Sequence, residues 1–230
     1  SSSFVWRLSD PALILPVRWI VLQLLAVCAY YFFVYLPSQL PGLIGRNGIT
    51  PVRDTLHEIK LRLKPFQPPG YEVKHKISLP LGPRLLNQFV LWSFEHKSDP
   101  DDARAVTLAK RGILASQIIF AGGILRALGE EVAGSAMQFG GCVACYLLHQ
   151  VFRRIGGMWL QLRWESLIEE FLLVALPATL PASSPTAQAL QLWILQLLGF
   201  KLLLQSGLCK LLSRDESWHD GTAMAHHNET

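Results

Sequence analysis

The chain has 230 residues and a formal net charge of +4; half of its residues are hydrophobic and only 17% are charged. Soluble domains usually carry about 25% charged residues, so the composition favours a membrane protein and excludes a disordered chain. Four cysteines in so long a chain exclude a disulfide scaffold. The mild basic balance would also suit nucleic acid, but the apolar blocks described next favour a membrane, and we expect no nucleic-acid partner.

Five apolar blocks predict an all-α protein, a polytopic membrane bundle of about five transmembrane helices. The first block, Trp19–Leu36, has 18 residues and no charge, which is enough to cross a hydrocarbon core of roughly 30 Å. The other blocks are Gly112–Leu128, Val132–Phe152, Leu167–Leu180 and Ala187–Leu208. The less favoured alternative is a helical bundle buried in a large soluble protein.

These blocks divide the chain into four segments. Residues 1–36 form an N-terminal segment with the first span, and residues 37–111 form a long, polar, basic loop. Residues 112–208 form a four-helix membrane bundle, and residues 209–230 form a polar C-terminal tail.

The polar loop contains a predicted amphipathic helix. Thr50 and Pro51 suit a helix cap and a first helical position. An apolar face then follows at helical spacing, with basic residues opposite; its members are Val52, Leu56, Ile59 and Leu63. Such a helix lies in the headgroup plane, although a helix that caps the bundle is equally compatible with the pattern. The apolar patch Leu85–Trp92 is too short to span and is either interfacial or re-entrant.

Three glutamates stand at the start of the fourth block: Glu165, Glu169 and Glu170. A carboxylate within a membrane is costly and normally faces a partner in the bundle. The candidate partners are Arg163, Lys201 and Arg126. Two alternatives remain open, namely protonated glutamates and a span that begins only after Glu170.

Cys142 and Cys145 form a C-x-x-C pair inside the third apolar block. This spacing occurs in redox and metal sites, but a thiolate there would be desolvated and a second pair is absent from the sequence. Packing is the favoured interpretation, because small residues recur every four positions beside the cysteines and let membrane helices approach closely. The predicted packing residues are Ala136, Gly140 and Ala144, with Ala133 and Gly141 beside them.

The polar tail contains His219, His226 and His227 but lacks the spacing of a known metal motif. The sequence also lacks a nucleophile elbow, a phosphate-binding loop and a dinucleotide-binding fingerprint. We therefore expect no catalytic residues, no metal and no cofactor.

Three ordered stretches resemble the lipase maturation factor family. Near the start, Gly42–Asp54 is similar to a G-L-I-G-x-N-G-I-x-P motif through Gly42, Gly45, Asn47, Gly48 and Pro51. In RWESLIEE, Trp164 and Glu170 match a Q-W-D-x-L-L-L-E motif, in which Glu165 replaces Asp. In the tail, the matches are Lys210, Leu211, Ser213, Asp215, Trp218, Thr222, Ala223, His227, Glu229 and Thr230, and the departures are Arg214, Met224, His226 and Asn228.

The resemblance implies a multi-pass protein of the endoplasmic reticulum membrane. Family members help dimeric secreted lipases to fold and leave the reticulum, and they are not known to be enzymes. Their large soluble region follows the tail motif, so we expect this chain to be the membrane-spanning half alone. Expected partners are membrane lipids and either a client protein or other membrane-protein subunits.

The favoured function is thus a non-catalytic assembly or maturation factor, or scaffold. One alternative is an accessory structural subunit of a respiratory or photosynthetic complex, in a mitochondrial or plastid inner membrane. A less favoured alternative is a membrane thiol oxidoreductase that uses Cys142 and Cys145.

Overall fold

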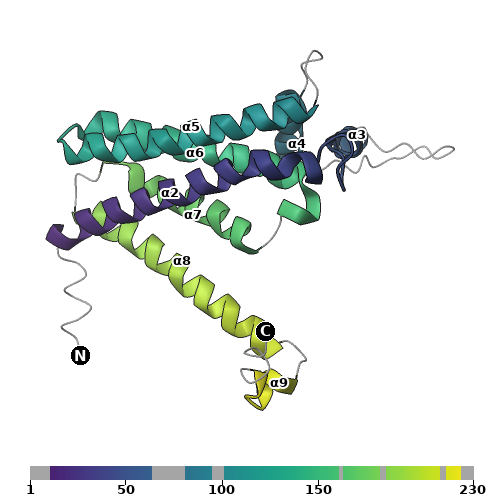
Figure 1. Ribbon diagram of the computed structural model, residues 1–230. Coiled ribbons are helices and arrows are strands. Elements are labelled where there is room, and N and C mark those ends of the chain that lie inside the picture. The colour runs from purple at the N-terminus through teal and green to yellow at the C-terminus, as the bar shows by residue number, and fades with distance from the viewer. Residues whose placement is uncertain are drawn as a thin grey trace, which may run out of the picture. The chain divides into compact units, whose positions relative to one another are not determined.

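The computed structural model describes residues 11–63, 81–94, 101–160, 163–181, 185–212 and 216–223, which form helices and turns and contain no strand. The chain divides into two compact units, Leu15–Pro181 and a smaller one made of Ser1–Ile14 with Ala182–Thr230. In the larger unit lie most of α2 (Pro11–Leu43) and all of α3 (Val52–Leu63), α4 (Leu81–Phe94), α5 (Asp101–Ala127), α6 (Glu131–Ile155), η1 (Gly157–Leu160) and α7 (Arg163–Thr179) (Figure 1). The smaller unit contains α8 (Pro185–Leu212) and α9 (Glu216–His219).

Two of the described helices, α2 over Pro16–Leu43 and α5 over Ala103–Ala127, are long and apolar enough to cross a membrane. Helix α2 is longer than the predicted first span because it continues through Pro37 and Pro41. Helix α6 has sufficient length, with 25 residues, but its inward face carries polar side chains that make it less apolar. The predicted helical membrane bundle is confirmed, and the count of five spans stays a prediction.

The core of the larger unit lies between α2, α5, α6 and α7. Helices α5 and α6 form an antiparallel hairpin whose turn is closed by Gly129, at φ +96°, and α7 packs on α6 (Figure 1). The rings of Phe33 and Phe152 lie 6.2 Å apart in the middle of this core. Ile119 and Leu172 are fully buried in the same core. In a bilayer such side chains stabilise a bundle through van der Waals packing, because the lipid tails outside are as apolar as the core.

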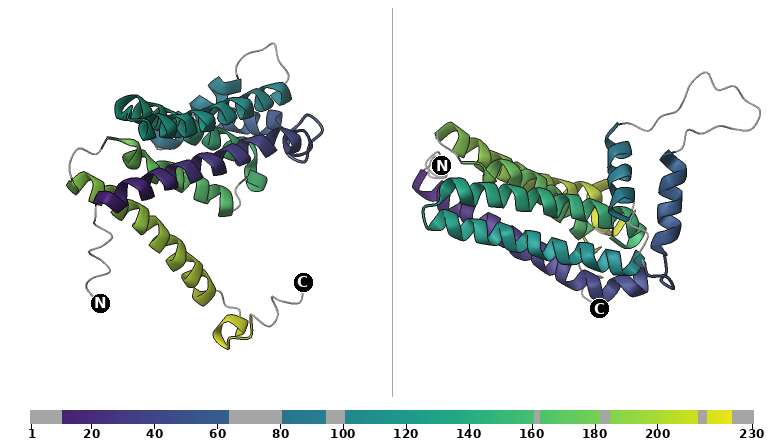
Figure 2. Two further views of the ribbon diagram at one scale, coloured as in Figure 1. Left: turned by 60° about the vertical axis from the view of Figure 1, so that its left-hand side comes forward. Right: turned by 90° about the horizontal axis from the view of Figure 1, so that it is seen from above.

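Helices α3 and α4 lie side by side across one end of the bundle (Figure 2). The apolar face of α3 is buried, with Val52 only 1% exposed and Leu56 and Ile59 at 8% and 6%. The elements that α3 contacts are α4, α5 and α6. The expectation that this face lies in the bilayer is therefore corrected: protein covers it, and the helix caps the bundle.

Candidate functional site

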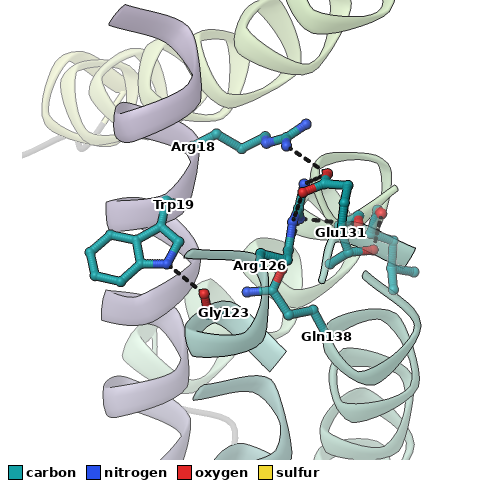
Figure 3. Close-up of polar contacts among 8 residues, drawn as sticks. Arg18, Trp19, Gly123, Arg126, Glu131 and Gln138 are labelled. Carbon is teal, nitrogen blue, oxygen red and sulfur yellow. Dashed lines mark hydrogen bonds and ion pairs between the residues drawn. The ribbon is translucent and has the colours of Figure 1, made fainter. Parts of the chain in front are cut away.

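An ion-pair cluster joins four helices at one end of the bundle; we call it the polar clasp, formed by Arg18, Arg126, Glu131, Gln138 and Thr179 (Figure 3). Arg126 is in the last turn of α5, and Glu131 is the first residue of α6. The guanidinium of Arg126 donates to both carboxylate oxygens of Glu131, at 3.1 Å from Nε and 2.5 Å from Nη2. Bidentate pairing of this kind is among the strongest polar contacts in proteins.

The α5–α6 turn places these two charges where the helix dipoles favour both of them. A cation at a helix C-terminus and an anion at a helix N-terminus are each stabilised by the partial charges of the helix ends. The turn itself is held by backbone bonds, including one of 2.9 Å from the Glu130 N–H to the Leu125 carbonyl. Residues close together in the sequence therefore form this pair, whereas its other contacts come from distant helices.

The remaining contacts of the clasp come from distant parts of the chain. Arg126 Nη1 donates to the Gln138 side-chain oxygen at 2.8 Å and to the Thr179 carbonyl, at the end of α7, at 3.2 Å. Arg18 of α2 donates from Nη2 to Glu131 at 3.4 Å. Next to it, the Trp19 indole donates to the Gly123 carbonyl at 2.8 Å. The Glu131 carboxylate thus links α2 and α5 to α6, and Arg126 adds α7 through the Thr179 carbonyl.

The burial of the clasp points to a structural role. The side chains of Arg18 and Arg126 are each 6% exposed, whereas that of Glu131 is 45% exposed. Two cations therefore share one half-exposed anion, and Glu131 reduces the repulsion between them. Every polar atom of the Arg126 guanidinium has an acceptor, so the group is used in packing the bundle.

A second ion pair lies further along the α6–α7 contact. Arg153 donates to Glu169, and the same carboxylate oxygen lies 4.0 Å from Nδ1 of the buried His149. The partners predicted for the glutamates, Arg163, Lys201 and Arg126, do not include Arg153, and Arg126 pairs with Glu131 instead. Glu170 is half-buried in α7. Its pairing with Lys201 stays a prediction, since Lys201 belongs to the other unit.

The close approach of α5 and α6 uses Gly134, which was not predicted, and Gly141, which was predicted beside the stripe of Ala136, Gly140 and Ala144. A Cβ at Gly134 would lie 2.5 Å from the Gly122 carbonyl oxygen, and one at Gly141 would lie 2.9 Å from the Ala115 carbonyl oxygen. At the predicted Gly140, a Cβ would meet nothing within 4 Å. Of its predicted neighbours, Ala136 is exposed and Ala144 is half-buried.

The two cysteines of the C-x-x-C pair are buried in the same helix contact. Cys142 and Cys145 are both 0% exposed and carry free thiols. The Cys145 thiol lies 3.9 Å from the Gly112 carbonyl oxygen of α5. Thiol–disulfide exchange requires access to the sulfur, so this placement supports packing over redox chemistry.

We expect N-ethylmaleimide to modify Cys209, but neither cysteine of the C-x-x-C pair, in the folded protein in detergent. Cys209 is exposed, whereas Cys142 and Cys145 should react only after denaturation. Cys28 is also exposed from the protein, but it lies in the middle of the span of α2, where detergent covers it. Mass spectrometry of peptides before and after unfolding measures this directly. Rapid modification of Cys145 in folded protein would favour the oxidoreductase alternative.

The Gly42–Pro51 motif forms a compact turn between α2 and α3. Its backbone N–H groups bond back to α2, as from Thr50 to the Leu43 carbonyl at 2.9 Å. A Cβ at Gly45 would lie 2.3 Å from the Pro41 carbonyl oxygen, and one at Gly48 would lie 2.8 Å from Leu43. Asn47 is exposed. The turn therefore needs glycine at two of the matched positions for steric reasons.

Gly45→Ala should destabilise the protein, whereas Gly42→Ala should be neutral. The first substitution forces backbone atoms apart, a strain that costs roughly 1–3 kcal/mol; at Gly42 a Cβ would meet nothing within 4 Å. Thermal unfolding in detergent, followed by size-exclusion chromatography, compares the two variants. Equal midpoints would contradict the steric role of this turn.

The tail motif is folded back in its described part. The ammonium group of Lys210, near the end of α8, lies 4.5 Å from the centroid of the Trp218 ring in α9. Thr222 donates its N–H and its hydroxyl to Asp220, at 2.9 and 2.7 Å.

Other predicted motif residues lie outside the described residues, namely Ser213, Asp215, His227 and Glu229, and so do the side chains of Trp164 and Glu165. In the described part of the chain, no three His, Cys, Asp or Glu side chains gather as a metal site.

Comparison with known proteins identifies the family. Residues 16–230 match the family model described as the lipase maturation factor transmembrane domain. The chain belongs to the lipase maturation factor family. It is 26% identical to human lipase maturation factor 2 over 232 aligned positions, which cover 93% of this chain and 28% of the relative. The mouse protein is 27% identical over 229 positions, covering 91% of this chain and 28% of the relative.

The match confirms the resemblance drawn from the three motifs. This member of the family spans just over a quarter of the length of the curated relatives that it matches. The matched family model describes a transmembrane domain, which agrees with the two candidate spans in α2 and α5. No solved structure matches the chain. The individual roles of the motif residues stay predictions.

Proposed function

We propose that the chain is the membrane-embedded part of a maturation factor that acts on a secreted client protein without catalysing a reaction. The observation that carries the proposal is the match to the lipase maturation factor transmembrane domain over residues 16–230. The relatives named lipase maturation factor 2 support a lipase as the client. The family resemblance supports a location in the endoplasmic reticulum membrane.

The bundle's polar side chains support a scaffold role. In the described residues, the strongest polar contacts tie helices together, as in the clasp at Glu131 and the pair between Arg153 and Glu169. The two thiols of the C-x-x-C pair are buried. A scaffold of this kind holds its helices in a fixed arrangement in the bilayer and presents surfaces to a client or to partner subunits.

The test is client secretion in cells that lack the endogenous protein. Re-expression of the full-length protein should restore the secreted activity of a dimeric lipase, and the destabilised Glu131→Leu variant should restore less in proportion to its lower abundance. Lipase secretion that does not depend on the protein would overturn the maturation role. On a mild-detergent native gel, a stable, stoichiometric large complex would instead favour the accessory-subunit alternative.

A further inference from the structure

The outer side of α4 carries an apolar stripe with two exposed residues, Leu85 and Trp92, and the half-buried Phe89 between them. Leu85 is 54% exposed and Trp92 is 66% exposed. The Trp92 ring stacks on that of Phe89, with centroids 6.0 Å apart. Positions three and four residues apart share one side of a helix, so the three residues form a single stripe. The opposite side of α4 packs inward through Asn87, Val90 and Phe94.

Helix α4 lies at the level where a candidate membrane span begins. The guanidinium of Arg104 donates from Nη1 to the Ser93 carbonyl in the last turn of α4, at 3.4 Å. Arg104 is next to the first residue of the span Ala103–Ala127. Figure 2 shows that α4 runs across this end of the bundle. If α5 crosses the membrane, a helix that runs across its end lies near the membrane surface.

We propose that the stripe of Leu85, Phe89 and Trp92 inserts into the interface of the lipid bilayer. An apolar face at this depth is stabilised when it lies at the boundary of headgroups and acyl chains. Tryptophan suits the same layer, because its ring is apolar and its indole N–H needs a polar neighbour. Arg84 is exposed one residue before Leu85 and supplies a positive charge at the level of the lipid phosphates.

The sequence places two segments at the membrane interface, α3 and the Leu85–Trp92 patch of α4. The apolar face of α3 is covered by protein, whereas Leu85 and Trp92 of α4 are exposed. The stripe would anchor the α3–α4 cap on the membrane and fix the depth of the Gly42–Pro51 turn beside it. The proposal rests only on α5 crossing the membrane. It can therefore fail while the maturation role holds, and the reverse is also true.

Spin-label accessibility in reconstituted vesicles tests the proposal. In the full chain, Cys28→Ser and Cys209→Ser remove the two exposed cysteines, and Trp92→Cys carries the nitroxide. The labelled protein is reconstituted in phosphatidylcholine–phosphatidylserine vesicles. Collisions with oxygen, which enriches in lipid, are compared with collisions with a water-soluble nickel chelate. The matched control is Lys60→Cys, which is exposed on α3. We expect the oxygen-to-nickel ratio at position 92 to exceed that at position 60 several-fold.

Two results would overturn the proposal. A nickel accessibility at position 92 equal to that at position 60 would place the stripe in water. A label that neither reagent reaches would mean that another protein surface covers it. Leu85→Cys provides a second position on the stripe and should give the same high ratio, so the test does not depend on one variant.

Discussion

Replacing Glu131 by leucine is expected to remove most of the folded protein. Its carboxylate accepts hydrogen bonds from both Arg126 and Arg18, whose side chains are each only 6% exposed. Without it, two buried cations face each other across the bundle. Removing one partner of a buried ion pair costs about 3–5 kcal/mol; we expect roughly 3 kcal/mol, because Glu131 is partly exposed. The yield of monodisperse protein and its thermal midpoint in detergent measure the effect.

The neighbouring residue Glu130 provides a matched control. It is exposed and its side chain makes no capping hydrogen bond, so Glu130→Leu removes the same charge at little cost. Glu131→Gln keeps one acceptor oxygen, so its thermal midpoint should lie between those of Glu130→Leu and Glu131→Leu. Adding Arg18→Met to Glu131→Leu removes one of the two neighbouring cations and should restore part of the stability, a non-additive result. Equal stability of Glu130→Leu and Glu131→Leu would show that the clasp contributes nothing.

The apolar runs predicted the class of the protein because they need no knowledge of neighbouring helices. The charge-free run Trp19–Leu36 identifies α2 as a membrane helix by length alone. Its ends were less predictable, since Pro37 and Pro41 usually end a helix in water. Inside a membrane bundle other groups satisfy the freed carbonyls, and α2 continues to Leu43.

The partners of the buried charges could not be predicted, because pairing depends on how each helix is rotated. Arg126 was predicted as a partner for the glutamates of the fourth block, whereas the structure pairs it with Glu131. The useful signal was local: a cation in the last turn of one helix and an anion in the first turn of the next, five residues apart. The contribution of Arg18, more than 100 residues away, has no sequence signal of this kind.

The inward face of α6 was predicted wrongly because the prediction assumed a regular spacing of four residues. The buried positions Gly134, Gln138, Gly141 and Cys145 are spaced four, three and four residues apart, which stays on one side of a helix with 3.6 residues per turn. The stripe of Ala136, Gly140 and Ala144 is spaced by four throughout and drifts around the helix. Only the first spacing keeps one side of α6 buried, with Gly134 and Gly141 where α5 approaches most closely.

Replacing Ile59 by aspartate is expected to unfold the cap formed by α3 and α4. Ile59 is 6% exposed and packs in the same core as Leu56 and Val90. An unpaired carboxylate in this position belongs to the small class of substitutions that cost more than about 4 kcal/mol. Hydrogen exchange of the α3 amides should accelerate toward the unfolded rate, and the thermal midpoint of the whole protein should fall.

The control is Leu61→Asp, two residues along the same helix. Leu61 is 51% exposed, so an aspartate there remains in contact with solvent and should change neither measurement. The pair of variants also separates the two interpretations of α3. If its apolar face lay in the bilayer, Ile59→Asp would release the helix while the bundle kept its thermal midpoint. A fall in the midpoint with Ile59→Asp alone would show that α3 is held by protein contacts and that the cap stabilises the bundle.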